Sequence, residues 1–420
     1  MNRFQPLYCL LFLLAGSVPL CAQTGGEDLH PDPETRLRVP IDQNYAAAPS
    51  SSTEGILGST FPRIHGSDAL HFDYEYTGGV FTNARGGGRT SHSTRYAGIF
   101  DMGITADTAK LGLWKNGTFY THALFSHGEN PSNWVGDWQG VAVFAYETPA
   151  QVSEYWYEHH FLDETVFVRA GKIDAGVDFF YLDSTENFVN ASGTCVPTTG
   201  IPTAPGNAWG AMSVLNLSKN CCFKFGFFDA DGDANQFWMS ETGNVYTAYQ
   251  FDYHYDLFKY LPGFAYIGAW YNDNENMSYA GGVHSGKSGY SVGVEQMIYR
   301  KNYLKNGDNR GLTFFTQFSQ PQSDRENALR TFWGLGMRYL GFFENRPDDV
   351  LGFGVFQASF DRGLLAADSL PFANETAYEI HYHAHITDNA AVQPILQYVV
   401  HPGGRYRNAV VPGFSFQIVF

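Results

Sequence analysis

Apolar and polar residues alternate along most of the chain with a period of two, which is the pattern of β-strands whose two faces meet different surroundings. The first such segment places Leu70, Phe72, Tyr74 and Tyr76 on one face and His71, Asp73, Glu75 and Thr77 on the other. The last segment places Val410, Phe414, Phe416, Ile418 and Phe420 opposite Ser415 and Gln417. From Phe61 onward no segment of convincing length shows a helical period. The pattern therefore predicts an all-β fold.

Sixteen alternating segments can be counted after Phe61. They begin near Leu70, Arg95, Gly117, Gln151, Thr165, Ala208, Cys221, Gly243, Pro262, Lys287, Gly311, Leu329, Val350, Asn374, Ala391 and Arg407. An even number of strands lets both ends of a closed barrel lie on the same side of a membrane. We therefore expect a transmembrane antiparallel β-barrel of 16 strands.

The connections between these segments fall into two classes, as in outer-membrane barrels, where periplasmic turns are short and outer loops are long. Short connections are expected at residues 162–164, 218–220 and 387–390. Long connections are expected at residues 128–150, 174–207, 229–242 and 272–286. The alternation is imperfect, because the connection at 300–310 is long for the side of the short turns.

The composition favours a membrane barrel over a soluble β-sandwich. Aromatic residues make up 16% of the chain and charged residues only 16%, below the usual fraction of about a quarter. In a sandwich the apolar faces would meet a second sheet, but here the polar faces are too charged and the apolar faces too aromatic for a two-layer core. A barrel also escapes hydropathy analysis, because each alternating strand averages to neutral.

The N-terminal region precedes the barrel. Arg3, the apolar run that follows it and the small residue Ala22 predict a secretory signal peptide over residues 1–22. Residues 23–60 are rich in Pro, Ser, Ala and charge and show no period, which predicts a flexible leader. The barrel is assigned to residues 61–420.

The net charge of −16 argues against a nucleic-acid partner, which requires a basic face. It suits a water-filled lumen that does not favour anions. Beyond the signal peptide the cysteines are Cys195, Cys221 and Cys222. One disulfide between Cys195 and either member of the vicinal pair is possible in an oxidising compartment, and incidental free thiols are the alternative.

Alternation also predicts which side chains point into the barrel. In the segment from Gln151, the residues expected to face lipid are Tyr155, Tyr157 and Phe161. The residues expected to point into the barrel are then Glu154, Trp156, Glu158 and His160. In the next segment Arg169 points inward, so a short turn brings it near Glu158. An opposed acid and base would create a transverse field across a constriction. The alternative is a salt bridge that stiffens the wall.

The connection at 174–207 is the candidate to fold into the lumen, where it would carry Asp174, Asp178 and Tyr181. Tyr266 and Trp270 share an inward face if Ile267, Ala269 and Tyr271 face lipid. Their rings could stack against the apolar faces of sugars, since a sugar pore needs weak contacts at several sites. A role in the aromatic girdle at the membrane surface is the alternative.

Two further clusters could bind metal ions. His381, His383 and His385 share one strand face, a spacing compatible with zinc if another ligand converges. The sequence DADGDAN at 229–235 clusters carboxylates as calcium loops do, without their register. Solvated lumen histidines and an acidic surface loop are the favoured interpretations, so we predict no metal site, cofactor or catalytic residue.

Four segments resemble the carbohydrate-selective porins, often called the OprB family. They are QPILQYVVHPGG at 393–404, YWYEHHFLDETVFVRAGKID at 155–174, NFVNASG at 187–193 and LPGFAYIGAWYN at 261–272. The resemblance extends over residues 61–420 and implies a sugar channel. His401 stands where that family usually has Asn, and the leader and the Cys195 loop look unlike the family.

We therefore expect a porin of the cell outer membrane through which sugars and other small polar solutes diffuse passively. The alternatives are an outer-membrane barrel enzyme of the lipid-hydrolase type and a barrel for other small solutes, such as anions or amino acids. Expected partners are the solutes, outer-membrane lipids, the barrel assembly machinery that would recognise the terminal Phe420, and further copies of the chain.

Overall fold

The computed structural model describes residues 69–279, 282–302, 308–322 and 327–420. All of them belong to one compact unit, Pro40–Phe420. The predicted signal peptide and leader lie outside the described residues and stay predictions. Within the described part of the chain, no helix has the length and apolar character needed to cross a bilayer.

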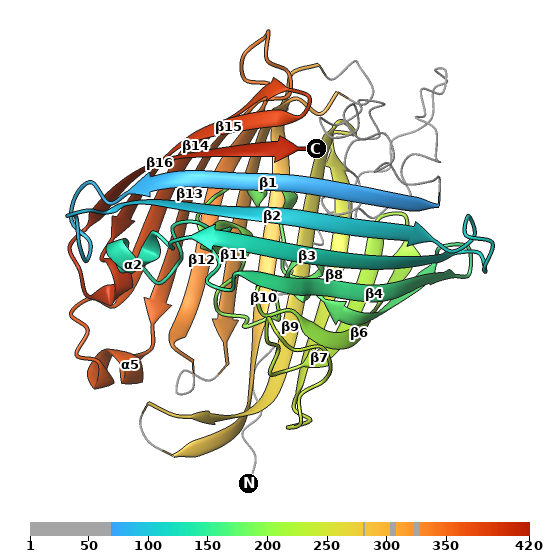
Figure 1. Ribbon diagram of the computed structural model, residues 1–420, viewed down its shortest axis with the longest axis horizontal. Helices are drawn as coiled ribbons and strands as arrows, with labels where there is room; N and C mark the ends of the chain where they lie inside the picture. The colour runs from blue at the N-terminus through green and yellow to red at the C-terminus, as the bar shows by residue number, and fades with distance from the viewer. Residues whose placement is uncertain (1–68, 280–281, 303–307, 323–326) are drawn as a thin grey trace, which may run out of the picture. The chain divides into compact units, whose positions relative to one another are not determined.

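Sixteen antiparallel strands form a closed barrel, because the first strand pairs with the last (Figure 1). In chain order they are β1 (Leu70–Thr82), β2 (Thr94–Asp107), β3 (Gly117–Gly128), β4 (Ala150–Phe161), β5 (Val166–Ile173), β6 (Ala208–Ser218), β7 (Cys221–Asp229), β8 (Val245–Leu257), β9 (Leu261–Met277), β10 (Val283–Arg300), β11 (Gly311–Pro321), β12 (Leu329–Leu340), β13 (Val350–Phe360), β14 (Asn374–Thr387), β15 (Ala390–Val400) and β16 (Ala409–Val419). The predicted fold class and strand number are confirmed. The predicted start differs most for β10, expected from Lys287 and found at Val283.

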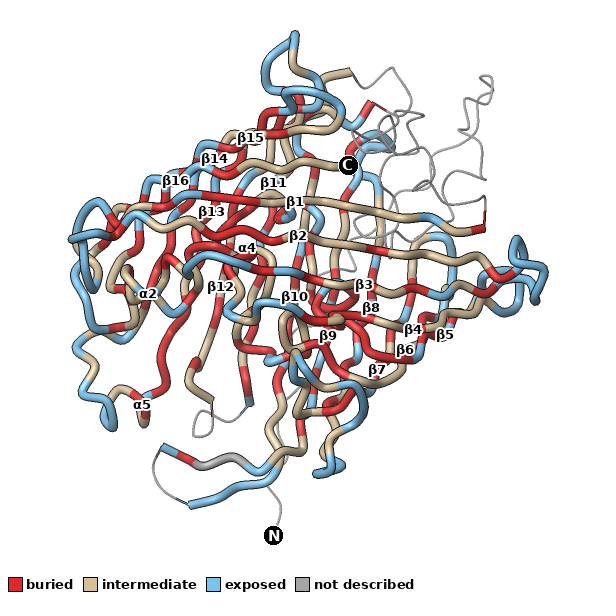
Figure 2. Tube along the Cα trace, in the orientation of Figure 1, coloured by how far each residue is buried: buried red, intermediate tan, exposed pale blue. Residues whose placement is uncertain are grey.

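Exposure alternates along the strands, as the sequence pattern predicts (Figure 2). On β5 the outward Val168 is 38% exposed, whereas the next residue, Arg169, is 3% exposed. On β9 the inward Tyr266 and Trp270 are buried, whereas Ile267 between them is 60% exposed. The exposed apolar side chains form the outer surface of the barrel, which suits contact with lipid acyl chains.

Short turns gather at one end of the barrel and long connections at the other. Short turns occupy residues 162–165, 219–220, 258–260 and 388–389, whereas long connections occupy 129–149, 174–207, 230–244 and 361–373. In the β4–β5 turn Leu162, Asp163 and Glu164 have φ values of 52°, 50° and 65°. Left-handed conformations of this kind suit the tight reversal of a β-hairpin.

The prediction of a long loop at 272–286 is wrong. Backbone pairing continues to Met277 on β9 and resumes at Val283 on β10, with a register shift between Ser285 and Lys287. The polar residues of this hairpin lack alternation, which was interpreted as a loop. Strand pairing needs only backbone groups, so a hairpin whose two faces both meet water has no reason to alternate.

Several connections contain short helices. These are α2 (Ser132–Val135), α3 (Ala175–Asp178), η2 (Asp183–Thr185), α4 (Ala191–Thr194), α5 (Arg362–Ala367) and η3 (Pro402–Gly404). The helices α3, η2 and α4 all belong to the connection at 174–207, which we call the lumen loop. The helix α2 belongs to the connection at 129–149, which we call the β3–β4 loop.

The β3–β4 loop packs against the inner wall of the barrel. Its Val135, Val141 and Phe144 form one buried apolar cluster with wall residues from β1, β2, β3, β15 and β16. The wall residues of the cluster are Phe81, Ala97, Ile99, Leu124, Ile395, Val399, Ala409 and Val411. This part of the inner wall is apolar because the loop, and not water, covers it.

Candidate functional site

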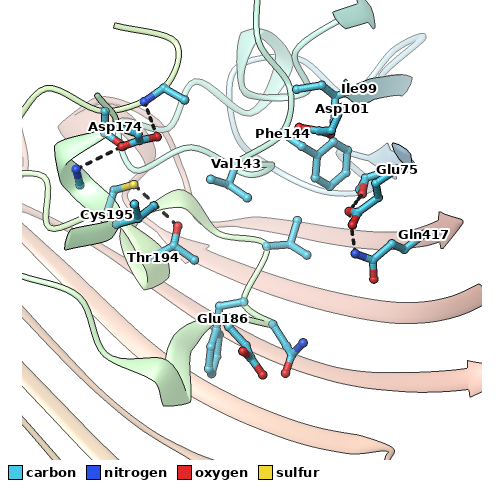
Figure 3. Close-up of a pocket in the computed structure, with 18 of the residues that line it drawn as sticks. Glu75, Ile99, Asp101, Val143, Phe144, Asp174, Glu186, Thr194, Cys195 and Gln417 are labelled. Carbon is cyan, nitrogen blue, oxygen red and sulfur yellow. Dashed lines mark hydrogen bonds between the residues drawn. The ribbon is translucent and has the colours of Figure 1, made fainter. Parts of the chain in front are cut away.

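The lumen contains a cavity of about 620 Å³. Its lining combines strand residues with residues of the two inserted loops. Figure 3 shows Glu75 and Gln417 on one side, Asp174, Thr194 and Cys195 on the other, and Val143 and Phe144 of the β3–β4 loop between them. The cavity therefore has the size of a small-molecule site and a mixed polar and apolar lining.

The lumen loop enters the barrel at Asp174, as the sequence predicts. The Asp174 carboxylate caps α3 by accepting the Gly176 N–H at 3.1 Å, and it also accepts the Ala204 N–H at 3.1 Å. Burial raises the pKa of Asp174, and these hydrogen bonds oppose the shift. One side chain thus ties the start of the lumen loop to its end.

Glu158 on β4 and Arg169 on β5 lie directly opposite each other. The Arg169 guanidinium donates to Glu158 at 2.8 and 3.0 Å and, on its other side, to Asp178 of α3 at 3.0 Å. It also lies over the Trp156 ring at 4.2 Å. Burial raises the pKa of Asp178, although Arg169 opposes the shift. Arg169 thus connects the barrel wall to the lumen loop.

Glu154 also contacts the lumen loop. Its carboxylate accepts the backbone N–H of Asp174 at 3.0 Å and the indole N–H of Trp156 at 3.2 Å. Glu154 and Trp156 are both buried. Two of the inward residues predicted on β4 therefore support the entry of the lumen loop.

Tyr266 and Trp270 point inward but lie behind the lumen loop. The Tyr266 hydroxyl donates to the Phe180 carbonyl at 3.3 Å. Trp270 stacks on Tyr246 with ring centres 6.1 Å apart. Of the eight lining residues predicted from the sequence, three border the cavity, namely Arg169, Asp174 and Asp178, and Tyr181 borders it too. The other five, Glu154, Trp156, Glu158, Tyr266 and Trp270, are not among its lining residues.

A buried carboxylate on β14 binds the middle of the lumen loop. Glu379 is 0% exposed and accepts the backbone N–H groups of Val189 at 3.0 Å and Asn190 at 2.7 Å. It also accepts the Gln397 amide at 3.0 Å and contacts the His381 ring at 2.9 Å. A charged acceptor in this position fixes the loop strongly, because charge-assisted hydrogen bonds are about twice as strong as neutral ones.

The same arrangement recurs at other points of the two inserted loops. Glu295 on β10 accepts the Ser184 N–H at 2.8 Å, and Gln250 on β8 accepts the Phe180 N–H at 2.6 Å. Glu375 on β14 accepts two successive N–H groups of the β3–β4 loop, at residues 138 and 139, both at 2.8 Å. Inward polar side chains of the wall therefore satisfy the backbone donors of loops that lie inside the barrel.

The cavity lining is acidic. Its charged side chains are six carboxylates, Glu75, Asp101, Asp174, Asp178, Asp183 and Glu186, and two guanidinium groups, Arg169 and Arg338. Arg338 on β12 pairs with Glu186 of the lumen loop at 2.8 Å. Carboxylates therefore outnumber guanidinium groups three to one in the lining.

Sequence reasoning missed several of these residues. Glu75 was placed on a polar face by alternation but was not assigned to the lumen. Asp101 and Arg338 lie on β2 and β12, where Gly and apolar neighbours weaken the alternation signal. Asp183 and Glu186 belong to the lumen loop, for which no periodicity predicts direction.

The described residues contain no group of three or more His, Cys, Asp or Glu side chains able to hold a metal ion. His381 contacts Glu379, and His383 contacts Gln393 at 3.0 Å. In the DADGDAN segment, Asp229 accepts hydrogen bonds from Ser240 and Gln236, so its oxygens are used within the loop.

The possible disulfide is not formed. Cys195, Cys221 and Cys222 are all free thiols. Cys195 follows α4 inside the lumen, whereas Cys221 and Cys222 begin β7 beside a short turn. Hydrogen bonds and packing, and no disulfide among these three cysteines, hold the lumen loop in this structure.

Comparisons with known proteins agree with this architecture. Porin B of Pseudomonas aeruginosa is 24% identical over an alignment that covers 83% of this chain and 87% of that protein. The high pH structure of Pseudomonas putida OprB is 23% identical and superposes with a TM-score of 0.74, covering 84% of this chain and 94% of that one. The low pH structure of the same protein is 19% identical, with a TM-score of 0.55 and coverage of 84% and 93%.

The family resemblance inferred from four short segments is confirmed. The sequence model of the carbohydrate-selective porins, OprB family, matches residues 91–420, which is most of the chain. The barrel, the inserted loops and the polar lumen have the architecture that such a channel requires. The chain therefore belongs to the OprB family of carbohydrate-selective porins and is an outer-membrane porin for the diffusion of sugars.

Proposed function

We propose that this porin selects small neutral and cationic polar solutes, sugars above all, by the width and acidity of the passage beside its lumen loop. The observation that carries the proposal is the cavity of about 620 Å³ lined by both inserted loops and by the wall. Conduction requires contacts that are favourable enough for entry and weak enough for exit. Carboxylates, amides and apolar side chains together offer such contacts to sugar hydroxyls and to sugar faces.

The acidic lining argues against the alternative of an anion channel. Six carboxylates against two guanidinium groups border the cavity, and Arg169 and Arg338 are each paired with a carboxylate. An anion would meet unbalanced negative charge on its way through. A neutral sugar meets hydrogen-bonding partners without this barrier.

The proposed role is passive, without catalysis. A lipid hydrolase in a barrel wall would need a nucleophile and a base that converge on the outer surface. The histidines singled out in the sequence, His381 and His383, contact Glu379 and Gln393 on the inner side. On the outer surface His127 and His159 contact the hydroxyls of Tyr76 and Tyr157. Tyrosine hydroxyls of this kind suit a membrane interface.

The remaining assignments follow from the proposed place in the outer membrane. Outer-membrane lipids would contact the exposed apolar side chains of the strands. Assembly machinery would recognise the last strand and Phe420, and further copies of the chain could associate. Residues 1–22 would direct export, and residues 23–60 would form the leader.

A liposome-swelling assay tests the selectivity. We expect the purified porin to admit glucose and glucosamine faster than gluconate, which has a similar size and a negative charge. The difference should shrink at 1 M salt, where the Debye length is about 3 Å. Faster entry of gluconate than of glucose would contradict the proposal.

A further inference from the structure

Three outward side chains on the barrel wall form a row. Tyr155 on β4, Lys172 on β5 and Trp209 on β6 lie directly opposite one another in the strand register. Alternation places all three on the outer face, since Val168 and Ala170 on β5 are exposed while Arg169 points inward. A lysine on this face is unexpected, because a charge exposed to acyl chains is destabilising.

The β7–β8 loop at 230–244 covers this row. Lys172 is 2% exposed, and its ammonium group donates to the carbonyls of Asp233 at 3.1 Å and Ala234 at 3.0 Å. The Trp209 indole donates to the Phe237 carbonyl at 2.8 Å, and the Tyr155 hydroxyl donates to the same carbonyl. The loop is therefore bound to the outer wall by side chains of three strands.

Asp229 at the end of β7 fixes the other side of the same loop. It accepts the Ser240 hydroxyl at 2.7 Å and the Gln236 amide at 3.3 Å. With the loop held on both sides, its apex presents three consecutive apolar residues. Phe237, Trp238 and Met239 are 66%, 65% and 43% exposed.

The apex continues the lipid-facing surface of the wall. Phe237 stacks on Tyr155 with ring centres 5.9 Å apart, and Trp238 lies against Trp209 at 4.2 Å. Tyr and Trp are the residues enriched where a barrel meets the membrane surface. We propose that the β7–β8 loop is a membrane-anchoring arm, whose Phe237, Trp238 and Met239 insert among the acyl chains of the outer leaflet.

A lipid surface fits this apex better than a second copy of the chain. Three side chains offer much less surface than the roughly 800 Å² per partner that a stable protein interface buries. The polar part of the same loop, including Asp231 and Thr242, is internally hydrogen-bonded and can remain in water. In this arrangement Lys172 is a positioning residue, because it holds the arm and does not itself meet the lipid.

Tryptophan quenching tests the arm. The porin is reconstituted in phosphatidylcholine vesicles with or without brominated acyl chains, and iodide serves as the aqueous quencher. The emission that disappears in Trp238→Phe is the emission of Trp238. This part should be quenched by brominated lipid and not by iodide. The matched control is Trp138→Phe in the β3–β4 loop, because Trp138 is 48% exposed; it should lose emission that iodide quenches.

Two other results would overturn the proposal. Loss of iodide-quenched emission in Trp238→Phe would place the apex in water. If the emission lost in Trp238→Phe is quenched by neither brominated lipid nor iodide, the apex of the loop lies against protein, and therefore against a second copy. In Lys172→Met the Trp238 emission should be quenched by iodide and no longer by brominated lipid, while the single-channel conductance stays the same. Unchanged quenching would contradict the role of Lys172 in holding the loop.

Discussion

Arg169 joins the barrel wall to the start of the lumen loop through a buried ion pair with Asp178. Arg169→Met keeps much of the side-chain length but removes the guanidinium, so Glu158 and Asp178 lose the donors at 2.8 and 3.0 Å. Removing one partner of a buried ion pair costs about 3–5 kcal/mol. Most of this cost comes from Asp178, because its side chain is 2% exposed and would remain buried without Arg169. Glu158 is 13% exposed and would still contact the His160 ring at 2.8 Å.

We expect Arg169→Met to lower the free energy of unfolding in urea and to raise single-channel conductance, because the start of the lumen loop is released from the wall. In a double-mutant cycle with Asp178→Asn, the coupling energy should be about 1–3 kcal/mol. Arg338→Met is the matched control. Its ion pair with Glu186 is more exposed, at 24% and 30%, so its loss should cost about 0–1 kcal/mol.

The two interpretations of Arg169 left open by the sequence give different results. If Arg169 mainly supplied a transverse field, Arg169→Met would shift the reversal potential towards stronger cation preference and leave stability unchanged. If it mainly ties the loop, stability falls and conductance rises together. Stability and conductance both equal to those of the unmodified porin would refute the structural argument.

Three further predictions follow from other parts of the barrel. Glu379→Gln should raise conductance and current noise in planar bilayers, because an amide offers only one acceptor oxygen to the N–H groups of Val189 and Asn190. The control Glu129→Gln, at an exposed site, should leave both quantities unchanged. Equal current traces for the two variants would contradict this prediction. Burial raises the pKa of Asp137 in the β3–β4 loop from 3.8 to about 6. Ionisation of Asp137 therefore lowers the free energy of unfolding as the pH rises from 3.8 to about 6. Asp137→Asn should therefore stabilise the barrel by up to about 3 kcal/mol above pH 6 and not below pH 4; a pH-independent difference in melting would exclude this cause. Deleting Phe420 should reduce the yield of folded protein in outer membranes, measured by heat-modifiable mobility, and normal yield would show that the terminal residue is dispensable.

The strands were predictable because their two faces meet different surroundings. Lipid outside and a polar lumen inside impose a period of two, and the predicted first residues of β1, β3, β6 and β13 agree with the structure. Where both faces meet water this constraint disappears, so the sequence pattern at 272–286 predicts a loop although the backbone forms a hairpin. The inner wall beneath the β3–β4 loop shows a related limit, because Ile99 and Val411 point inward and are apolar.

The site was less predictable because long-range contacts define it. The pairing of Glu158 with Arg169 could be derived, since a short turn fixes the register of β4 and β5. The contact of Glu379 with Val189 joins residues far apart in the chain, and no local pattern indicates it. The same holds for Arg338 and Glu186. Where a loop runs inside a barrel, its partners depend on the closed fold and not on the neighbouring sequence.

We propose that the lumen loop sets the width and the selectivity of this sugar channel. The most direct test is the single-channel conductance of a variant in which residues 184–199 are replaced by a short Gly-Ser linker, recorded with and without glucose and larger oligosaccharides. Heat-modifiable mobility first shows that the variant forms a barrel. If the loop narrows the lumen, the variant should show higher conductance, weaker block by glucose and less discrimination by size. A folded variant with the conductance and sugar block of the unmodified porin would contradict it.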